Sequence, residues 1–163
     1  MADAALELLA AARAYRTALV AADAPEREFA RRVRNALARV YLAAALLGPP
    51  GAAESDDAPG QRADAGESRA LRERLQARFG ERDAFVDVLD PSGITGAGRA
   101  PHDRSLSQEL VEIDEDLAEA IARLEQDAPD ALWDARFAFE QHWGSHAVAC
   151  LRPLHELATH GVV

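Results

Sequence analysis

The sequence predicts an all-α protein, an irregular antiparallel bundle of four main helices plus one shorter helix. Three observations lead to this prediction. Hydrophobic residues make up 48% of the 163 residues, and Ala and Leu dominate over β-branched types, which favours helix over strand. Apolar residues recur at helical spacing in several long segments. Segments rich in Pro and Gly separate them. The length favours a single domain spanning residues 1–163.

Two amphipathic segments open the chain. The first helix is predicted over Asp3–Ala22, where Asp3 is placed to cap the helix. Pro25 marks a restart at a first helical position, and the second helix is predicted over Pro25–Leu47. The sequence Gly-Pro-Pro-Gly at 48–51 ends that helix.

The middle of the chain is less regular. Residues 48–66 are rich in Gly, Pro, Ala, Asp and Ser, which predicts a loop. The shorter helix is predicted over Ser68–Phe79. Residues 85–89 form an apolar run that is either a short strand or one to two helical turns, because periodicity does not distinguish these over so few residues. A second loop is predicted over residues 90–104.

Ser105 opens the fourth helix, with Gln108 completing a capping box. A short turn at 127–129 then leads into the last helix, so the last two helices are predicted to form an antiparallel hairpin. If this turn is centred near Ala128, residues at equal depth have numbers that sum to about 256. Apolar pairs then face one another at four levels: Leu132 with Leu124, Phe139 with Leu117, Trp143 with Ile113, and Cys150 with Leu106.

The last helix, within Ala128–Leu157, holds both tryptophans and the only cysteine. As a continuous α-helix it has one apolar stripe, formed by Leu132, Phe139, Trp143, Ala147, Cys150, Leu154 and Leu157. Gly144 weakens a helix, so we expect a neighbouring backbone or ring to approach it closely. Pro153 lacks a backbone donor and predicts a kink or an end of the helix.

This last segment also resembles a known family. Its pattern is a Trp, an acidic and a basic residue, then Phe-Glu, Trp-Gly and a closing Leu-Arg-x-Leu-His. The matching positions are Trp133, Asp134, Arg136, Phe139, Glu140, Trp143, Gly144, Leu151, Arg152, Leu154 and His155. The pattern resembles the uncharacterised bacterial family called domain of unknown function 5063, with looser matches from about residue 29 onward. The resemblance implies a compact all-helical bacterial domain and implies no activity, cofactor or catalytic residue.

Composition excludes several classes of function. The chain has 28 acidic against 18 basic residues and a net charge of −10, which opposes nonspecific nucleic-acid binding. Every basic residue is Arg, so chemistry that needs a lysine, such as a P-loop or a Schiff base, is excluded. A single cysteine excludes an intrachain disulfide. The N-terminus lacks signal-peptide features, and the longest apolar run, Val40–Leu47, is too short to span a membrane. We therefore expect a soluble cytoplasmic protein that binds neither membrane nor nucleic acid.

One candidate site is a divalent-metal site between the last two helices. His142 and His146 are four residues apart, a spacing that directs both rings to one ion. The depth relation places them opposite three carboxylates of the fourth helix at i, i+3 and i+7, which are Glu109, Glu112 and Asp116. The alternative is that His142 is solvated and that His146 is half-buried beside a carboxylate.

A second candidate is a small-anion pocket formed by Arg136, Glu140, Trp143 and His146, with the guanidinium for the anion and an aromatic wall. The alternative is a structural network in which the Arg136 and Glu140 charges neutralise each other. The glycine-rich segment 93–98 lacks phosphate-loop spacing and is predicted to be a flexible loop.

These observations lead to two functional hypotheses. The first is a non-catalytic helical module that binds a protein partner or itself, with no cofactor. The second is a bundle site for a metal ion or small anion, with or without an enzymatic activity, and no residue is identified as catalytic. A large exposed apolar patch favours the first hypothesis. A pocket where Arg136, Glu140 and His146 converge favours the second.

Overall fold

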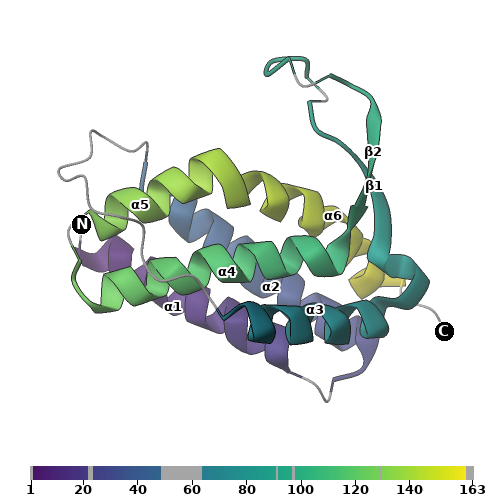
Figure 1. Ribbon diagram of the computed structural model, residues 1–163, viewed down its shortest axis with the longest axis horizontal. Helices are drawn as coiled ribbons and strands as arrows, with labels where there is room; N and C mark the ends of the chain where they lie inside the picture. Colours follow the sequence, from purple (N-terminus) through teal and green to yellow (C-terminus); the bar gives the residue numbers. More distant parts are fainter. Residues whose placement is uncertain are drawn as a thin grey trace.

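The protein is mostly helical, as predicted, with a small β-hairpin that projects from the helices (Figure 1). The computed structural model describes residues 2–21, 24–48, 64–90, 92–96, 98–128 and 130–160. The α-helices are α1 (Ala2–Val20), α2 (Glu26–Ala45), α3 (Ala65–Phe79), α4 (Leu106–Glu125), α5 (Ala131–Ala138) and α6 (Gly144–His160). The shorter elements are the 3-10 turn η1 (Gly80–Asp83), the π-helical turn η2 (Phe139–Trp143), and the strands β1 (Ala84–Val88) and β2 (Pro101–Ser105).

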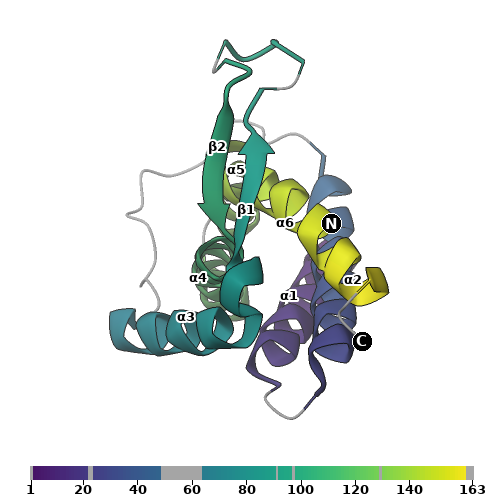
Figure 2. The same ribbon diagram turned by 90° about the vertical axis from the view of Figure 1, so that its right-hand side faces the viewer.

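Helix α4 lies at the centre of the bundle. It contacts α1, α3, α5 and α6, while α2 contacts both α1 and α6 (Figures 1 and 2). The predicted apolar face of α4 is buried from Leu106 to Ile121. The largest buried side chains of the core include Tyr15, Phe29, Phe79 and Trp143. No helix in the described part of the chain is both long and apolar enough to cross a membrane.

The predicted hairpin of the last two helices is confirmed. Helices α4 and α6 lie side by side and run in opposite directions (Figure 1). Three polar pairs across the hairpin show which residues of the two helices lie at equal depth. They are Asp116 with His142, Glu109 with His146, and Arg123 with Asp134, and their residue numbers sum to 255–258. The turn is therefore centred as the sequence indicated.

The last helix is not continuous, because the π-helical turn η2 adds one residue between α5 and α6. The backbone N–H of Gly144 donates to the carbonyl of Phe139, five residues earlier. The extra residue shifts the apolar stripe by one position before the turn. Consequently Ala131 and Ala135 are buried, whereas the predicted stripe member Leu132 is only half-buried.

The close approach of a neighbouring backbone and ring to Gly144, expected from the sequence, is confirmed. A Cβ atom at this position would lie 2.4 Å from the Phe139 carbonyl oxygen, and the ring of Phe139 is also within contact distance. The glycine therefore permits the π-helical turn. Helix α6 continues through Pro153 to His160, so the alternative in which Pro153 ends the helix is wrong.

The β-hairpin corrects the prediction of a loop over 90–104 and decides the ambiguity at 85–89. Strand β1 pairs with β2 in an antiparallel register from Ala84–Ser105 to Val88–Pro101. The sequence of β2, Pro-His-Asp-Arg-Ser, has no alternation of apolar and polar residues, so periodicity does not reveal it. Its pairing with β1 and ion pairs described below hold it in place.

The loops beside the hairpin and α3 differ from their predicted extents. Between the strands, the Asp90 carboxylate accepts backbone N–H bonds from Ile94, Thr95 and Gly96 at 2.8–2.9 Å. Helix α3 begins at Ala65 because Asp64 caps it, accepting from the Gly66 N–H at 2.6 Å, so the predicted 48–66 loop is too long at its end. Residues 49–63 of that loop lie outside the described residues.

Candidate functional site

The structure brings together all five residues of the predicted metal site. Glu109, Glu112 and Asp116 lie along the flank of α4 that faces α6. His142, from η2, and His146, from the first turn of α6, lie opposite them. We call these five residues the histidine–carboxylate cluster.

Each histidine is held by a carboxylate through its Nδ1 atom. His142 Nδ1 lies 2.6 Å from Asp116 Oδ2. His146 Nδ1 lies 2.5 Å from Glu109 Oε2 and 3.6 Å from Glu112 Oε2. The two imidazole rings are in edge-to-face contact, with centroids 4.6 Å apart. His142 is exposed and His146 is half-buried.

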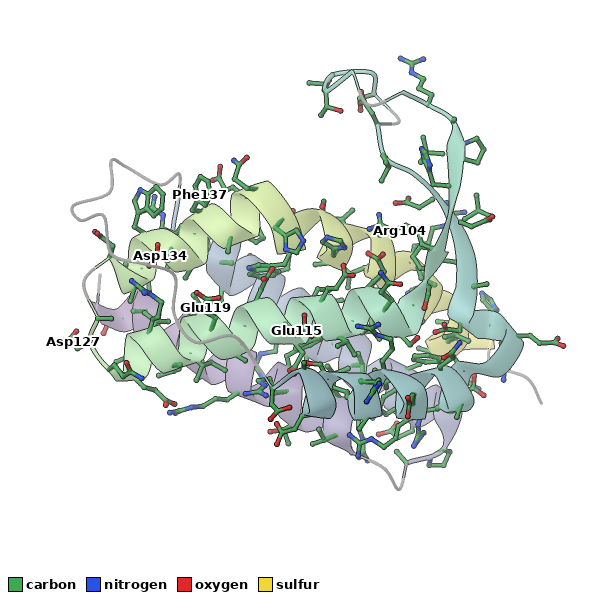
Figure 3. All side chains as sticks on the ribbon, in the orientation of Figure 1. Arg104, Glu115, Glu119, Asp127, Asp134 and Phe137 are labelled. Carbon is green, nitrogen blue, oxygen red and sulfur yellow. The ribbon has the colours of Figure 1, made fainter. Side chains whose placement is uncertain are left out.

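Arg104 is the member of this site that the sequence did not reveal. It comes from β2, where the hairpin meets the helices (Figure 3). Its Nη1 donates to Asp87 Oδ2 at 3.0 Å, and its Nη2 pairs with Glu109 and lies 3.1 Å from His146 Nδ1. The residue lies in the segment predicted to be a loop, so only the β-pairing explains its position.

The charges of the cluster shift two pKa values in opposite directions. The hydrogen bond to Glu109 raises the pKa of His146 against the effect of burial. Burial by itself disfavours the ionised form of Glu109, but bonds from His146 and Arg104 outweigh it and lower the pKa of this carboxyl. His146 Nδ1 forms one hydrogen bond in the plane of its ring, and it lies closer to Glu109 Oε2, at 2.5 Å, than to Arg104 Nη2, at 3.1 Å. A carboxylate only accepts, so in the bond to Glu109 this nitrogen is the donor.

The four residues of the predicted small-anion pocket do not converge. Arg136 Nε donates to the Gly48 carbonyl at 2.8 Å, and Glu140 is exposed. Both residues are described, and no ion pair joins them within the described chain. The π-helical turn begins between them and removes the regular i, i+4 relation. Trp143 is buried in the core, where its ring meets Phe139 edge-to-face at 4.8 Å.

A second feature is a groove between β1 and α6, next to Arg104. It has a volume of about 620 Å³. On the strand side it is lined by five consecutive residues, Phe85–Leu89, and on the helix side mainly by Val148, Ala149 and Pro153. Three of its lining residues are strongly exposed hydrophobics: Val86 at 65%, Val148 at 55% and Leu89 at 50%.

Comparison with known proteins supports the fold but adds no activity. The chain is similar to the crystal structure of protein BF1032 from Bacteroides fragilis, with a TM-score of 0.73 and 21% sequence identity. The similarity covers 93% of this chain and 90% of that one. No curated protein matches the chain. The family model described as "Domain of unknown function (DUF5063)" matches residues 1–160, which confirms the resemblance seen in the last helix, and the chain belongs to this family.

Proposed function

We propose that this protein is a non-catalytic interaction module that binds an extended segment of a partner protein in the groove between β1 and α6. The observation that carries the proposal is that five consecutive residues, Phe85–Leu89, line the groove. Side chains of a strand alternate between its two faces. A hollow that contacts consecutive residues is therefore not confined to one face of the strand and reaches its edge.

Among the described residues, no further strand pairs with that edge of β1. The sheet that they form has two strands, and β1 pairs with β2 on one side. An unpaired strand edge presents backbone donors and acceptors that an incoming extended segment satisfies. A segment laid between a strand edge and a helix gains affinity from backbone hydrogen bonds and specificity from its alternate side chains.

The lining of the groove indicates the chemistry of the segment. The exposed side chains of Val86, Leu89 and Val148 offer apolar contacts for alternate residues. The charged residues of the lining are Arg104, Arg152 and Asp87. Arg104 is paired with Asp87 and Glu109, so the exposed Arg152 is the cation that the groove offers to a ligand. An extended segment with alternating apolar residues and a carboxylate near Arg152 fits this lining.

Selection of peptides tests the proposal. A phage-displayed library of random peptides is selected on the purified protein, and binding of the selected peptides is measured by fluorescence anisotropy. Peptides with alternating apolar residues and an acidic residue are expected. Val148→Asp, which places a charge in the groove, is expected to weaken their binding by at least about 10-fold. The matched control is Leu42→Asp, a change of an exposed apolar residue on α2.

Three outcomes contradict the proposal. The library yields no binding peptide, or the selected peptides bind Val148→Asp as tightly as they bind the wild type. In the third, sedimentation shows a dimer that Val86→Asp dissociates, which makes a second copy of this chain the occupant of the groove.

A further inference from the structure

We infer that His142, His146 and Glu112 form a binding site for a divalent transition-metal ion, with Glu109 and Asp116 orienting the two histidines. Arg104 borders both this site and the groove, but none of the three ligand residues lines the groove, and the inference does not depend on the groove binding a peptide. It rests on ligand geometry, on the orientation of both rings and on the backbone that presents them.

The ligand atoms already lie near one another. Glu112, His142 and His146 each contribute one potential ligand atom, and these atoms lie within 4.8 Å of one another. Ligands bound at about 2.0–2.2 Å from one ion are separated by at most about 4.4 Å. His146 approaches Glu112 through its Nδ1 atom, at 3.6 Å from Oε2, so coordination through Nε2 requires the rings of His146 and of the exposed His142 to turn toward Glu112.

The hydrogen bonds leave a ligand atom of each residue available. Asp116 and Glu109 hold the Nδ1 atoms of His142 and His146, and neither Nε2 atom has a hydrogen bond within the described chain. Gln108 Nε2 donates to Glu112 Oε1 at 2.9 Å and so orients that carboxylate as well. Metal-binding histidines usually donate their second ring nitrogen to a carboxylate, which fixes the tautomer and the ring direction.

The backbone at this site is also unusual. His142 lies in the π-helical turn η2, and turns of this kind occur frequently at functional sites. Gly144 permits the turn, because a Cβ atom there would collide with the Phe139 carbonyl. The turn changes the angular relation of His142 to α5, and it presents the ring to Asp116 across the hairpin.

Charge and ligand type define the class of ion. Arg104 is balanced by Asp87 and Glu109, which leaves the charges of Glu112 and Asp116 for a cation. Two imidazoles with one carboxylate suit Zn²⁺, Fe²⁺ or Mn²⁺ better than Mg²⁺ or Ca²⁺, which prefer oxygen ligands alone. Three protein ligands leave positions on the ion open to water or to another ligand.

The test is titration of tag-free, metal-depleted protein with Zn²⁺ by calorimetry and with Co²⁺ by visible absorption. One ion per chain is expected. His142→Ala, His146→Ala and Glu112→Gln remove ligands and are each expected to reduce affinity by more than about 100-fold. Asp116→Asn and Glu109→Gln remove orienting carboxylates and are expected to reduce it by about 10–100-fold.

Two variants serve as matched controls, and both are expected to bind like the wild type. His102→Ala removes an exposed histidine of β2, and Glu115→Gln removes a carboxylate of α4 outside the cluster. Circular dichroism of every variant shows whether it is folded. The exposed position of His142 makes His142→Ala the variant least dependent on packing.

The inference is overturned if the wild type binds neither Zn²⁺ nor Co²⁺, or if folded His142→Ala binds both as tightly as the wild type. Equal affinity for Mg²⁺ and Zn²⁺ also overturns it, because that result indicates an acidic surface without histidine ligation. Val148→Asp is expected to bind Zn²⁺ normally, so failure of the groove proposal and failure of the metal site are distinguishable.

Discussion

Helix α4 carries acidic residues on two flanks, and the carboxylates of the two flanks differ in their hydrogen-bond partners. On the flank that faces α1, Asp114 accepts one bond from Arg16 Nε at 2.9 Å. On the flank that faces α6, Glu109 contacts both Arg104 and His146. Glu109 and Asp114 are buried to a similar extent, at 6% and 8% exposure. Burial alone therefore does not explain the difference between them.

The pKa values move in opposite directions. Burial raises the pKa of Asp114, and the single partner Arg16, whose side chain is substantially exposed, does not offset this effect. Burial by itself raises the pKa of Glu109, but hydrogen bonds from His146 and Arg104 outweigh it and lower that pKa. On this helix, the buried carboxyl that two donors meet has a lowered pKa, and the buried carboxyl that one donor meets has a raised pKa. The α1 flank is a packing surface that holds one carboxylate whose charge burial disfavours, whereas the α6 flank is an ordered polar cluster.

Glu109→Ala should give the largest loss of stability on either flank. It leaves Arg104 and His146 without their shared buried counter-charge. We expect the free energy of unfolding, measured by urea denaturation, to fall by about 3 kcal/mol. Glu115→Ala on the same helix is the control and should change it by less than about 0.5 kcal/mol. An equal, small change in both variants would show that the α6 flank is not an ordered cluster.

Gly144→Ala should destabilise the α6 side by a smaller amount. The new methyl group would meet the Phe139 carbonyl at 2.4 Å, so the π-helical turn must rearrange. We expect a loss of about 2 kcal/mol by urea denaturation, together with weaker Zn²⁺ binding as His142 moves. Gln141→Ala, at an exposed position of the same turn, is the control. A variant with unchanged stability and unchanged Zn²⁺ affinity would contradict the positioning role of the turn.

Asp114→Asn should change the free energy of unfolding in the opposite direction from Glu109→Ala. The amide removes a charge that burial disfavours. We expect the free energy of unfolding at neutral pH to rise by up to about 1 kcal/mol. Chemical denaturation at constant ionic strength measures it. A loss of several kcal/mol would mean that the Arg16 pair stabilises the ionised carboxylate, and the contrast between the flanks would fail.

The effect of Asp114→Asn should also depend on pH. Folding raises the pKa of Asp114, so this carboxyl stabilises the folded state fully when the pH is below its unfolded-state pKa. That stabilisation is lost as the pH rises through the folded-state pKa. The variant is therefore expected to exceed the wild type at about pH 7 and to match it at about pH 3, below the ordinary Asp value. Denaturation curves at several pH values check this, and a constant difference across them would contradict it.

The residues of the α6 flank can be predicted from the sequence, because helical spacing and a short turn are enough to place them. Glu109, Glu112 and Asp116 share a helix face, and the centre of the turn fixes their depth relative to His142 and His146. The shared helix face and the depth relative to the turn are both set by local geometry, so the folded structure keeps them.

The residues that sequence reasoning missed depend on nonlocal or irregular structure. Arg104 reaches the cluster only because β2 pairs with β1, and the composition of β2 gives no strand pattern. Arg136 and Glu140 were placed on one face by an unbroken period, which the extra residue of the π-helical turn interrupts. Gly144, which permits this turn, is unfavourable within a helix, but its position in the sequence does not identify the carbonyl that it accommodates.

The most direct test of the contrast between the two flanks is anomalous diffraction from a crystal of the protein grown with Zn²⁺, recorded on both sides of the zinc absorption edge. We expect one strong peak among Glu112, His142 and His146, and no peak beside Asp114. A peak elsewhere on α4, or no peak among these three residues at full Zn²⁺ saturation, would contradict it.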